Sequence, residues 1–146
     1  MGKVRSSEVR ADHRTVVGMT VTLLDVPGLP EIPIYRQVSV ATGSRLIHVA
    51  GQVAWDGGDF ATQVEQAYLN VGTALAAAGA TFADVVKLTA HVVDWKPALM
   101  PELLDGIARA SARLGVTIAA PASLFGIVAL DVPEHLVEVE AVAVLD

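Results

Sequence analysis

The sequence contains no cysteine, which excludes disulfide bonds, thiolate nucleophiles and zinc sites built on cysteine. Long hydrophobic runs are missing as well, although hydrophobic residues make up 53% of the chain. The longest apolar runs, 117–122 and 124–130, are far shorter than the roughly 20 residues that a membrane-spanning helix needs. Surplus apolar surface without a membrane span predicts burial between the subunits of an oligomer.

Positive charge is scarce beyond the first 18 residues. Four basic against two acidic residues give positions 1–18 a net charge of +2, so the remainder carries −8 and the whole chain −6. Such an acidic body argues against nonspecific binding to the phosphate backbone of nucleic acids. We therefore expect no nucleic-acid partner, and the short apolar runs predict no membrane partner.

Residues 1–18 lack the apolar core of a secretory signal peptide. Their arginines resemble those of an organelle transit peptide, but Glu8 and Asp12 argue against that interpretation. Met19 is a plausible alternative start of the protein. We expect 1–18 to be a flexible N-terminal extension and 19–146 to be a single domain, located in the cytoplasm.

The spacing of apolar residues predicts the order β-β-β-α-β-α-β-β. Between Phe60 and Ala78 the apolar residues follow a helical stripe, and Gly79 supplies the stop. Pro101 opens a second helix, which ends before Gly115. We expect helices at 60–78 and 101–114, and strands at 21–24, 35–40, 46–53, 85–93, 124–130 and 136–144. This pattern predicts an α+β fold, in which two helices cover one face of a mixed sheet and the other face is free to pack on a partner.

A C-terminal motif carries the most information. Pro121-Ala122-Ser123-Leu124 is followed, after about a dozen residues, by Val137-Glu138-Val139-Glu140-Ala141. This arrangement resembles the signature of the RidA (YjgF) superfamily, which reads P-A-R-[ST] and then V-E-I-E-A. Further segments match other motifs of that family in the same order: 33–38, 47–53, 63–70, 78–80 and 84–87, with Asp94 after them. The resemblance therefore extends over nearly all of 34–143.

Resemblance to this family implies a fold like that of chorismate mutase and a homotrimer whose sheets pack around a central core. Small-molecule pockets would lie in the clefts between neighbouring subunits. The deaminase branch of the family hydrolyses enamines and imines made by pyridoxal-phosphate enzymes, releasing ammonia and a 2-oxo acid. The protein holds the substrate carboxylate, orients a water and supplies polar groups as the tetrahedral carbon forms. The resemblance implies neither a cofactor nor a metal.

Two residues are the candidates for catalysis. Glu138 matches the acid that positions the water in the deaminase branch, where a carboxylate can act as acid or base. Alternatively, Glu138 and Glu140 simply alternate with buried residues and face solvent; we prefer a functional role for Glu138 only. Tyr35 matches the family tyrosine that borders the pocket, and its hydroxyl could bind a substrate heteroatom. An interface tyrosine with a hydrated tip is an equal alternative.

Six further residues are expected to bind substrate, Ser123 among them. Gly51 lies where the family backbone approaches the ligand, although a strand glycine can also mark a bulge or close packing. Ala50 replaces a family serine and removes one hydroxyl donor. His48 stands at a tyrosine position of the family and is either a pocket group or a satisfied interface residue. Phe125 and Trp95 are expected to line the cleft, with ordinary packing as the alternative for Trp95.

Ser123 is the main departure from the family, because it replaces the arginine that grips the substrate carboxylate. A bidentate guanidinium–carboxylate pair outweighs one neutral hydroxyl hydrogen bond by about 2–3 kcal/mol, a factor of roughly 30–150 in transition-state binding. Other cations are poor substitutes for this arginine. Strand alternation places the Arg36 side chain on the other face of the strand from Tyr35. Arg45 lies in a turn, too far from the end of its strand. A serine-hydrolase role for Ser123 lacks a nucleophile elbow.

A metal site is not expected. His91 resembles His48 in that either can serve as a proton carrier or as a satisfied interface residue. The candidate ligands His48, His91, Asp94 and Glu138 lack the close i, i+2 or i, i+4 spacing of a typical site.

Three functions remain open, in decreasing order of preference. The first is a hydrolase-like or deaminase-like enzyme that acts on an imine, enamine or related carbonyl metabolite. It would not be an efficient 2-imino acid deaminase, because Ser123 replaces the arginine. The second is a non-catalytic metabolite-binding or regulatory trimer that uses the same cleft. The third is a purely structural role with the cleft closed or filled by side chains.

Overall fold

A computed structural model describes residues 20–146; the extension expected at 1–18 lies outside these described residues. The strands and helices in this part of the chain are β1 (Val21–Leu24), β2 (Val38–Ala41), β3 (Arg45–Gln52), α1 (Phe60–Ala77), β4 (Val85–Val93), α2 (Met100–Leu114), β5 (Ala122–Ile127) and β6 (Val137–Leu145). Short 3₁₀ turns, Phe82–Asp84 and Pro97–Leu99, precede β4 and α2. The predicted order of elements is confirmed.

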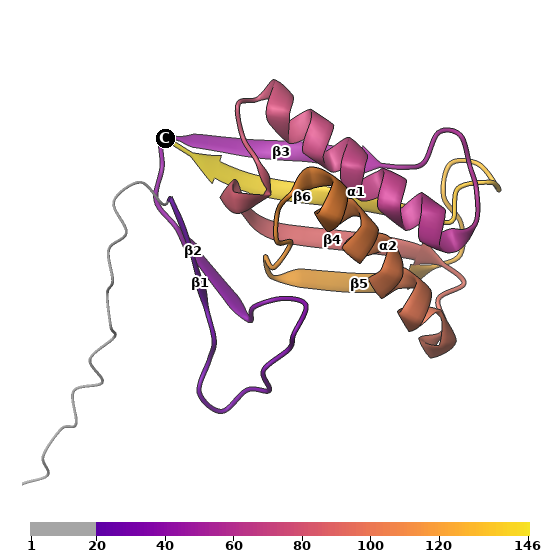
Figure 1. Cartoon of the computed structure of the whole chain (residues 1–146), viewed down its shortest axis with the longest axis horizontal. Helices are drawn as coiled ribbons and strands as arrows, with labels where there is room; N and C mark the ends of the chain where they lie inside the picture. Colours follow the sequence, from indigo (N-terminus) through magenta and orange to yellow (C-terminus); the bar gives the residue numbers. More distant parts are fainter. Residues whose placement is uncertain (1–19) are drawn as a thin grey trace, which may run out of the picture.

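The strands form two sheets. In the larger one the order is β3-β6-β4-β5, with β5 parallel to β4 and the other neighbours antiparallel. β1 and β2 pair antiparallel as a separate sheet, near the end of the larger sheet where the chain terminates (Figure 1). The Ser39 hydroxyl donates to the Val86 carbonyl at 2.6 Å, which ties β2 to β4.

The second strand begins later than predicted. The pattern predicts a strand from residue 35, but β2 begins at Val38. The backbone N–H of Arg36 donates at 2.9 Å to the carbonyl of Ala119, in the segment before β5, instead of to a neighbouring strand. The prediction that Tyr35 and Arg36 alternate along a strand is therefore wrong. The Arg36 guanidinium pairs with the Asp25 carboxylate at 3.4 Å.

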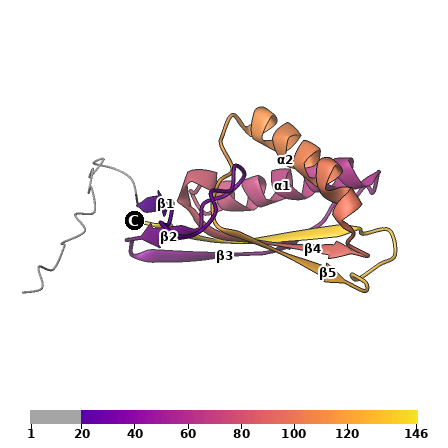
Figure 2. The same cartoon turned by 90° about the horizontal axis from the view of Figure 1, so that it is seen from below.

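Both helices cover the same face of the larger sheet, as predicted (Figure 2). α1 begins after Asp59, whose carboxylate accepts a hydrogen bond from the Thr62 N–H at 2.9 Å. α2 ends at Leu114 and is capped by Gly115, whose φ of 65° is a left-handed conformation that glycine adopts without strain. Buried apolar side chains of both layers form the core: Val64, Ala67, Val71 and Leu75 from α1, and Leu88, Val92, Val137 and Val139 from the sheet.

Among residues 20–146, no helix covers the opposite side of the larger sheet, which we call the open face. Strand alternation assigns its side chains in β4 and β6, because the residues between them are buried beneath the helices, and the strand register extends the assignment to β3 and β5. The open face consists of Leu46, His48, Ala50, Lys87, Thr89, His91, Val93, Ser123, Phe125, Ile127, Glu138, Glu140, Val142 and Val144. Leu46 is 65% exposed and Phe125 is 52% exposed, so apolar surface is available there for a partner.

Candidate functional site

Strand register brings several predicted site residues side by side on the open face. They form two neighbouring rows, where a row is a line of side chains that runs across the strands. His91 of β4 lies opposite Glu138 of β6 on one side and opposite Phe125 of β5 on the other. One row along, Thr89 lies opposite Ser123. Because adjacent strands are about 4.8 Å apart, the strands of Glu138 and Ser123 are separated by about 10 Å.

Glu138 lies directly over Gly51. A methyl group added at Gly51 would meet the carboxyl carbon and one carboxylate oxygen of Glu138, each at 2.3 Å. The β3–β6 register also shifts between Val49 and Gln52, so Gly51 lies at a bulge. The space that a side chain would fill at position 51 is taken by the half-buried carboxylate. Gly51 therefore marks both a bulge and close packing, the two structural interpretations of a strand glycine, and an approach of its backbone to a ligand stays a prediction.

Ser123 is not left without a cation. The Lys87 ammonium donates a hydrogen bond of 2.7 Å to the Ser123 hydroxyl, and both residues are half-buried. Sequence reasoning considered other cations and missed this one, because Lys87 was used only as part of a family motif. Its alternation with the buried Leu88 and Ala90 was the signal that places it on the face of Ser123.

His91 is held in place by an aromatic neighbour. Its ring stacks on the Phe125 ring, with centroids 5.9 Å apart and planes 22° from parallel. Its Nδ1 atom is buried and has no hydrogen-bond partner among the described residues. A buried polar atom without a partner is costly, so an additional donor or acceptor reaching this row would stabilise the site.

The other predicted residues of the open face are more exposed. His48 lies opposite Val142 on β3, and Ala50, two residues further, is also exposed. Neither side chain makes a hydrogen bond in the part of the chain that the structure describes. They border the row of Glu138 without contributing a fixed polar contact to it.

Tyr35 and Trp95 lie outside the strands that carry the open face. Tyr35 is half-buried in the segment before β2, and no hydrogen bond of residues 20–146 joins its hydroxyl to the open face. Trp95 follows β4 and packs against the core. A methyl group added at Gly126 would lie 3.0 Å from the Trp95 Cβ, on the helix-covered side of β5. Trp95 therefore does not share a face with Ser123 and Phe125 within one subunit.

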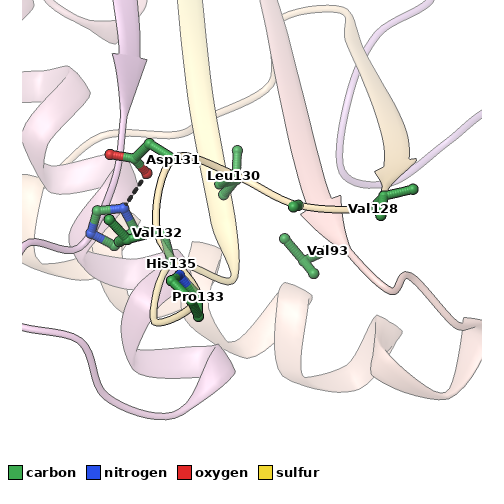
Figure 3. A pocket seen from close by; sticks show the side chains of 8 residues that line it. Val93, Val128, Leu130, Asp131, Val132, Pro133 and His135 are labelled. Carbon is green, nitrogen blue, oxygen red and sulfur yellow. Dashed lines mark hydrogen bonds and ion pairs between the residues drawn. The ribbon is translucent and has the colours of Figure 1, made fainter.

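A separate cavity of about 450 Å³ lies at the β5–β6 connection, beyond the end of β4 (Figure 3). Val93, residues 128–133 and His135 line it. The His135 Nδ1 atom lies 2.6 Å from the Asp131 carboxylate, and this hydrogen bond lowers the pKa of Asp131. Sequence reasoning did not predict this pair, although its i, i+4 spacing was the available signal.

The β5–β6 connection is anchored by a buried glutamine. The Gln63 amide donates to the carbonyls of Gly58 and Glu134 at 3.0 and 2.9 Å, and its oxygen accepts from the Leu136 N–H at 2.9 Å. These bonds satisfy the buried amide and hold the connection against the N-terminal end of α1.

Within residues 20–146, no group of three or more histidine or acidic side chains is close enough to hold a metal ion. No helix of the described residues is long and apolar enough to cross a membrane.

Comparisons with known proteins agree with this architecture. A family model described as endoribonuclease L-PSP matches residues 28–145, whereas no curated protein matches the chain significantly. The crystal structure of YyfB, a Rid-family protein from Yersinia pestis, is 32% identical, with a TM-score of 0.76 over 87% of this chain and 100% of that chain. Rv2704 from Mycobacterium tuberculosis, a member of the YjgF/YER057c/UK114 family, is 32% identical, with a TM-score of 0.58 over 76% of this chain and 86% of that chain. TdcF from E. coli, solved with bound serine, is 21% identical, with a TM-score of 0.60 over 86% of this chain and 99% of that chain; that likeness concerns the fold alone.

Proposed function

This chain belongs to the RidA (YjgF) superfamily and has its chorismate-mutase-like fold, and we propose that it hydrolyses an imine, enamine or related carbonyl metabolite on the open face. One observation carries the proposal: the Glu138 carboxylate is placed over the bare Cα of Gly51, on a face that no helix of residues 20–146 covers. A carboxylate fixed in this way can orient one water molecule against a substrate carbon.

The reaction needs only proton transfers around an added water. Glu138 accepts a proton from the water as the water oxygen bonds to the C=N carbon, and the substrate nitrogen takes up a proton from solvent. Protonated Glu138 then gives its proton to the amino nitrogen as the C–N bond of the tetrahedral species breaks; ammonia leaves, the hydroxyl group releases its proton to solvent, and a C=O group remains. Atoms balance without a redox partner.

We propose a homotrimer as the assembly in which this site is complete. Half-exposed Phe125 and exposed Leu46 lie on the open face, and association of these surfaces would bury them. The substrate cleft would then lie between neighbouring subunits. Tyr35, which lies in the segment before β2, would border the cleft of a neighbour and bind a substrate heteroatom there.

Efficient 2-imino acid deamination is not part of the proposal. Ser123 stands in place of the arginine of the family signature, and Ala50 in place of a serine. Both replacements remove polar groups that would hold a 2-imino acid and its transition state. A single ammonium or hydroxyl donor holds a carboxylate less firmly than a bidentate guanidinium.

The description of the matching family model as an endoribonuclease raises RNA as a candidate substrate. We do not extend it to this chain, because residues 19–146 carry a net charge of −8, and backbone recognition of RNA depends on clustered cations. Among residues 20–146, the open face carries one lysine, Lys87, and no arginine, against the carboxylates of Glu138 and Glu140. We expect no cleavage of single-stranded RNA; cleavage that is lost in Glu138→Gln would contradict the proposal.

Turnover by Glu138→Gln tests the proposed role of the carboxylate. Imines of a metabolite panel, including 2-iminobutanoate, are generated in solution, and ammonia release is measured. We expect Glu138→Gln to lose at least about 10²-fold in kcat/KM for the best substrate. Glu140→Gln, on the same face of the same strand, is the matched control and should retain wild-type rates. Equal losses in both variants, or none in Glu138→Gln, would contradict the catalytic role.

The alternative is a non-catalytic metabolite-binding or regulatory trimer that uses the same cleft. The absence of a hydroxyl at Ala50 and of an arginine at position 123 favours it, because both changes remove polar groups from the family pocket. This function predicts that wild-type protein turns over no member of the panel. It also predicts that Glu138→Gln binds metabolites with unchanged affinity.

A further inference from the structure

Lys87 is positioned differently from the four arginines of residues 20–146. Each of the four arginines in residues 20–146 is engaged by a carboxylate or by a backbone carbonyl: Arg36 by Asp25, Arg45 by the Asp146 carbonyl, Arg109 by Asp105 and Arg113 by Glu65. Within the same residues, the Lys87 ammonium makes no ion pair, and its hydrogen-bond partner is the Ser123 hydroxyl.

This arrangement leaves hydrogen-bond donors of both Lys87 and Ser123 free, close to one another. An ammonium has three N–H donors and no acceptor. One donor is used on Ser123, so the other two are available. The serine oxygen accepts from Lys87, which leaves its own O–H free to donate. A cation and a hydroxyl that both offer donors from a half-buried position form a small anion subsite.

The surroundings favour a single carboxylate as the anion. Thr89 lies beside Ser123 in the register, and the next row carries Phe125 and His91. One point charge and two hydroxyl-bearing residues match a group with one negative charge, whereas a phosphate dianion demands more cationic donors. Glu140, opposite Thr89, is the nearest carboxylate by register, and it forms no ion pair with Lys87.

We propose that Lys87 and Ser123 together hold the carboxylate of the substrate, in place of the arginine of the family signature. This inference rests on the proposed function and defines its substrate class: an imine, enamine or related carbonyl compound that carries one carboxylate. The roughly 10 Å between the strands of Ser123 and Glu138 accommodates a bound carboxylate, the adjoining carbon and one water in front of Glu138.

Binding of a charged probe and its neutral counterpart tests the subsite without any turnover. The probes are 2-oxobutanoate and 2-oxobutanamide, and their dissociation constants are measured by titration calorimetry or by ligand-detected NMR. Wild-type protein should bind the carboxylate at least about tenfold more tightly than the amide. Lys87→Met should lose this preference and keep its affinity for the amide. Lys96→Met, which removes an exposed lysine beyond the end of β4, is the matched control and should behave as wild type.

A preference that persists in Lys87→Met, or a wild-type protein that binds neither probe, would overturn the inference. If Lys87→Met fails to fold, the ammonium NMR resonances of Lys87 in the wild type decide instead. They should shift on addition of 2-oxobutanoate and stay in place with the amide. Ser123→Ala should reduce the preference by a smaller factor, roughly threefold to tenfold, because one neutral hydrogen bond is lost.

Failure of the two proposals is distinguishable. A Lys87-dependent preference in a protein without turnover would refute the catalytic function and support the subsite. Turnover that needs Glu138 but is equally fast for carboxylated and neutral imines in wild type and Lys87→Met would refute the subsite and support the catalytic function.

Discussion

Gly51→Ala separates the role of Glu138 from the stability of the fold. The added methyl group would lie 2.3 Å from the carboxyl carbon of Glu138, whereas ordinary contact begins near 3.4 Å. The carboxylate must therefore retreat by more than about 1 Å. A misplacement of about 1 Å can cost roughly 10²-fold in rate, so we expect a loss of that order in kcat/KM.

The same substitution should hardly change the free energy of unfolding. The group that must move is the end of a flexible, half-buried side chain, and a shifted rotamer costs about 0.5–1.5 kcal/mol. Replacing a strand glycine by alanine recovers about 0.5–1 kcal/mol of backbone entropy. We therefore expect a net change within about 1 kcal/mol, measured by urea unfolding.

Gly43→Ala is the matched control. Its methyl group would lie 2.8 Å from the backbone oxygen of Leu145 and from a Val144 methyl, and backbone cannot rotate away. This variant should lose about 1 kcal/mol or more of stability and keep its activity while folded. Full activity in Gly51→Ala, measured by ammonia release, would refute the reasoning about Glu138.

Three further predictions concern the helix contact, an ionisation and the signature position. Gly106→Ala should lower the free energy of unfolding by about 1–3 kcal/mol in urea titrations, because the methyl would lie 2.6 Å from the Ala61 backbone oxygen at the α1–α2 crossing; wild-type stability would contradict this packing. Burial raises the pKa of Tyr68 to about 12 from 10.0, so its protonated form stabilises the fold below pH 10, and that contribution is lost as the pH rises toward 12. The free energy of unfolding should therefore fall by about 1 kcal/mol between pH 9 and pH 11. Tyr68→Phe should remove this loss; an equal loss in the variant would show that Tyr68 is not responsible. Ser123→Arg should raise turnover of 2-iminobutanoate by about 10–100-fold; wild-type turnover that already equals the variant's would show that the missing arginine is unimportant.

Much of the fold follows from local patterns in the sequence. The stripe of Val64, Val71 and Leu75 in α1 and the alternation in β4 and β6 are periodic because one side of each element is buried. Such patterns also place Glu138 on the side away from the helices. The start of β2 was mispredicted, because Tyr35 and Arg36 have the pattern of strand residues, whereas the Arg36 N–H bonds to a segment more than 80 positions away.

The candidate site was harder to predict, because its contacts cross strands. Lys87 and Ser123 are separated by 36 positions, and only the β4–β5 register shows that the ammonium reaches the hydroxyl. The contact of Glu138 with Gly51 likewise depends on a bulge in the β3–β6 register. Trp95 was predicted to line the cleft because it follows a strand. Its side chain instead packs beside Gly126, on the helix-covered side of β5.

A crystal structure of the wild-type protein grown with 2-oxobutanoate tests the central claim most directly. The account predicts ligand density on the open face, at a cleft between subunits. The carboxylate should lie within hydrogen-bond distance of the Lys87 ammonium and the Ser123 hydroxyl, and the carbonyl carbon should face Glu138. Ligand bound only in the cavity beside His135, or an open face that is filled by side chains of a neighbouring subunit and leaves no cleft, would contradict it.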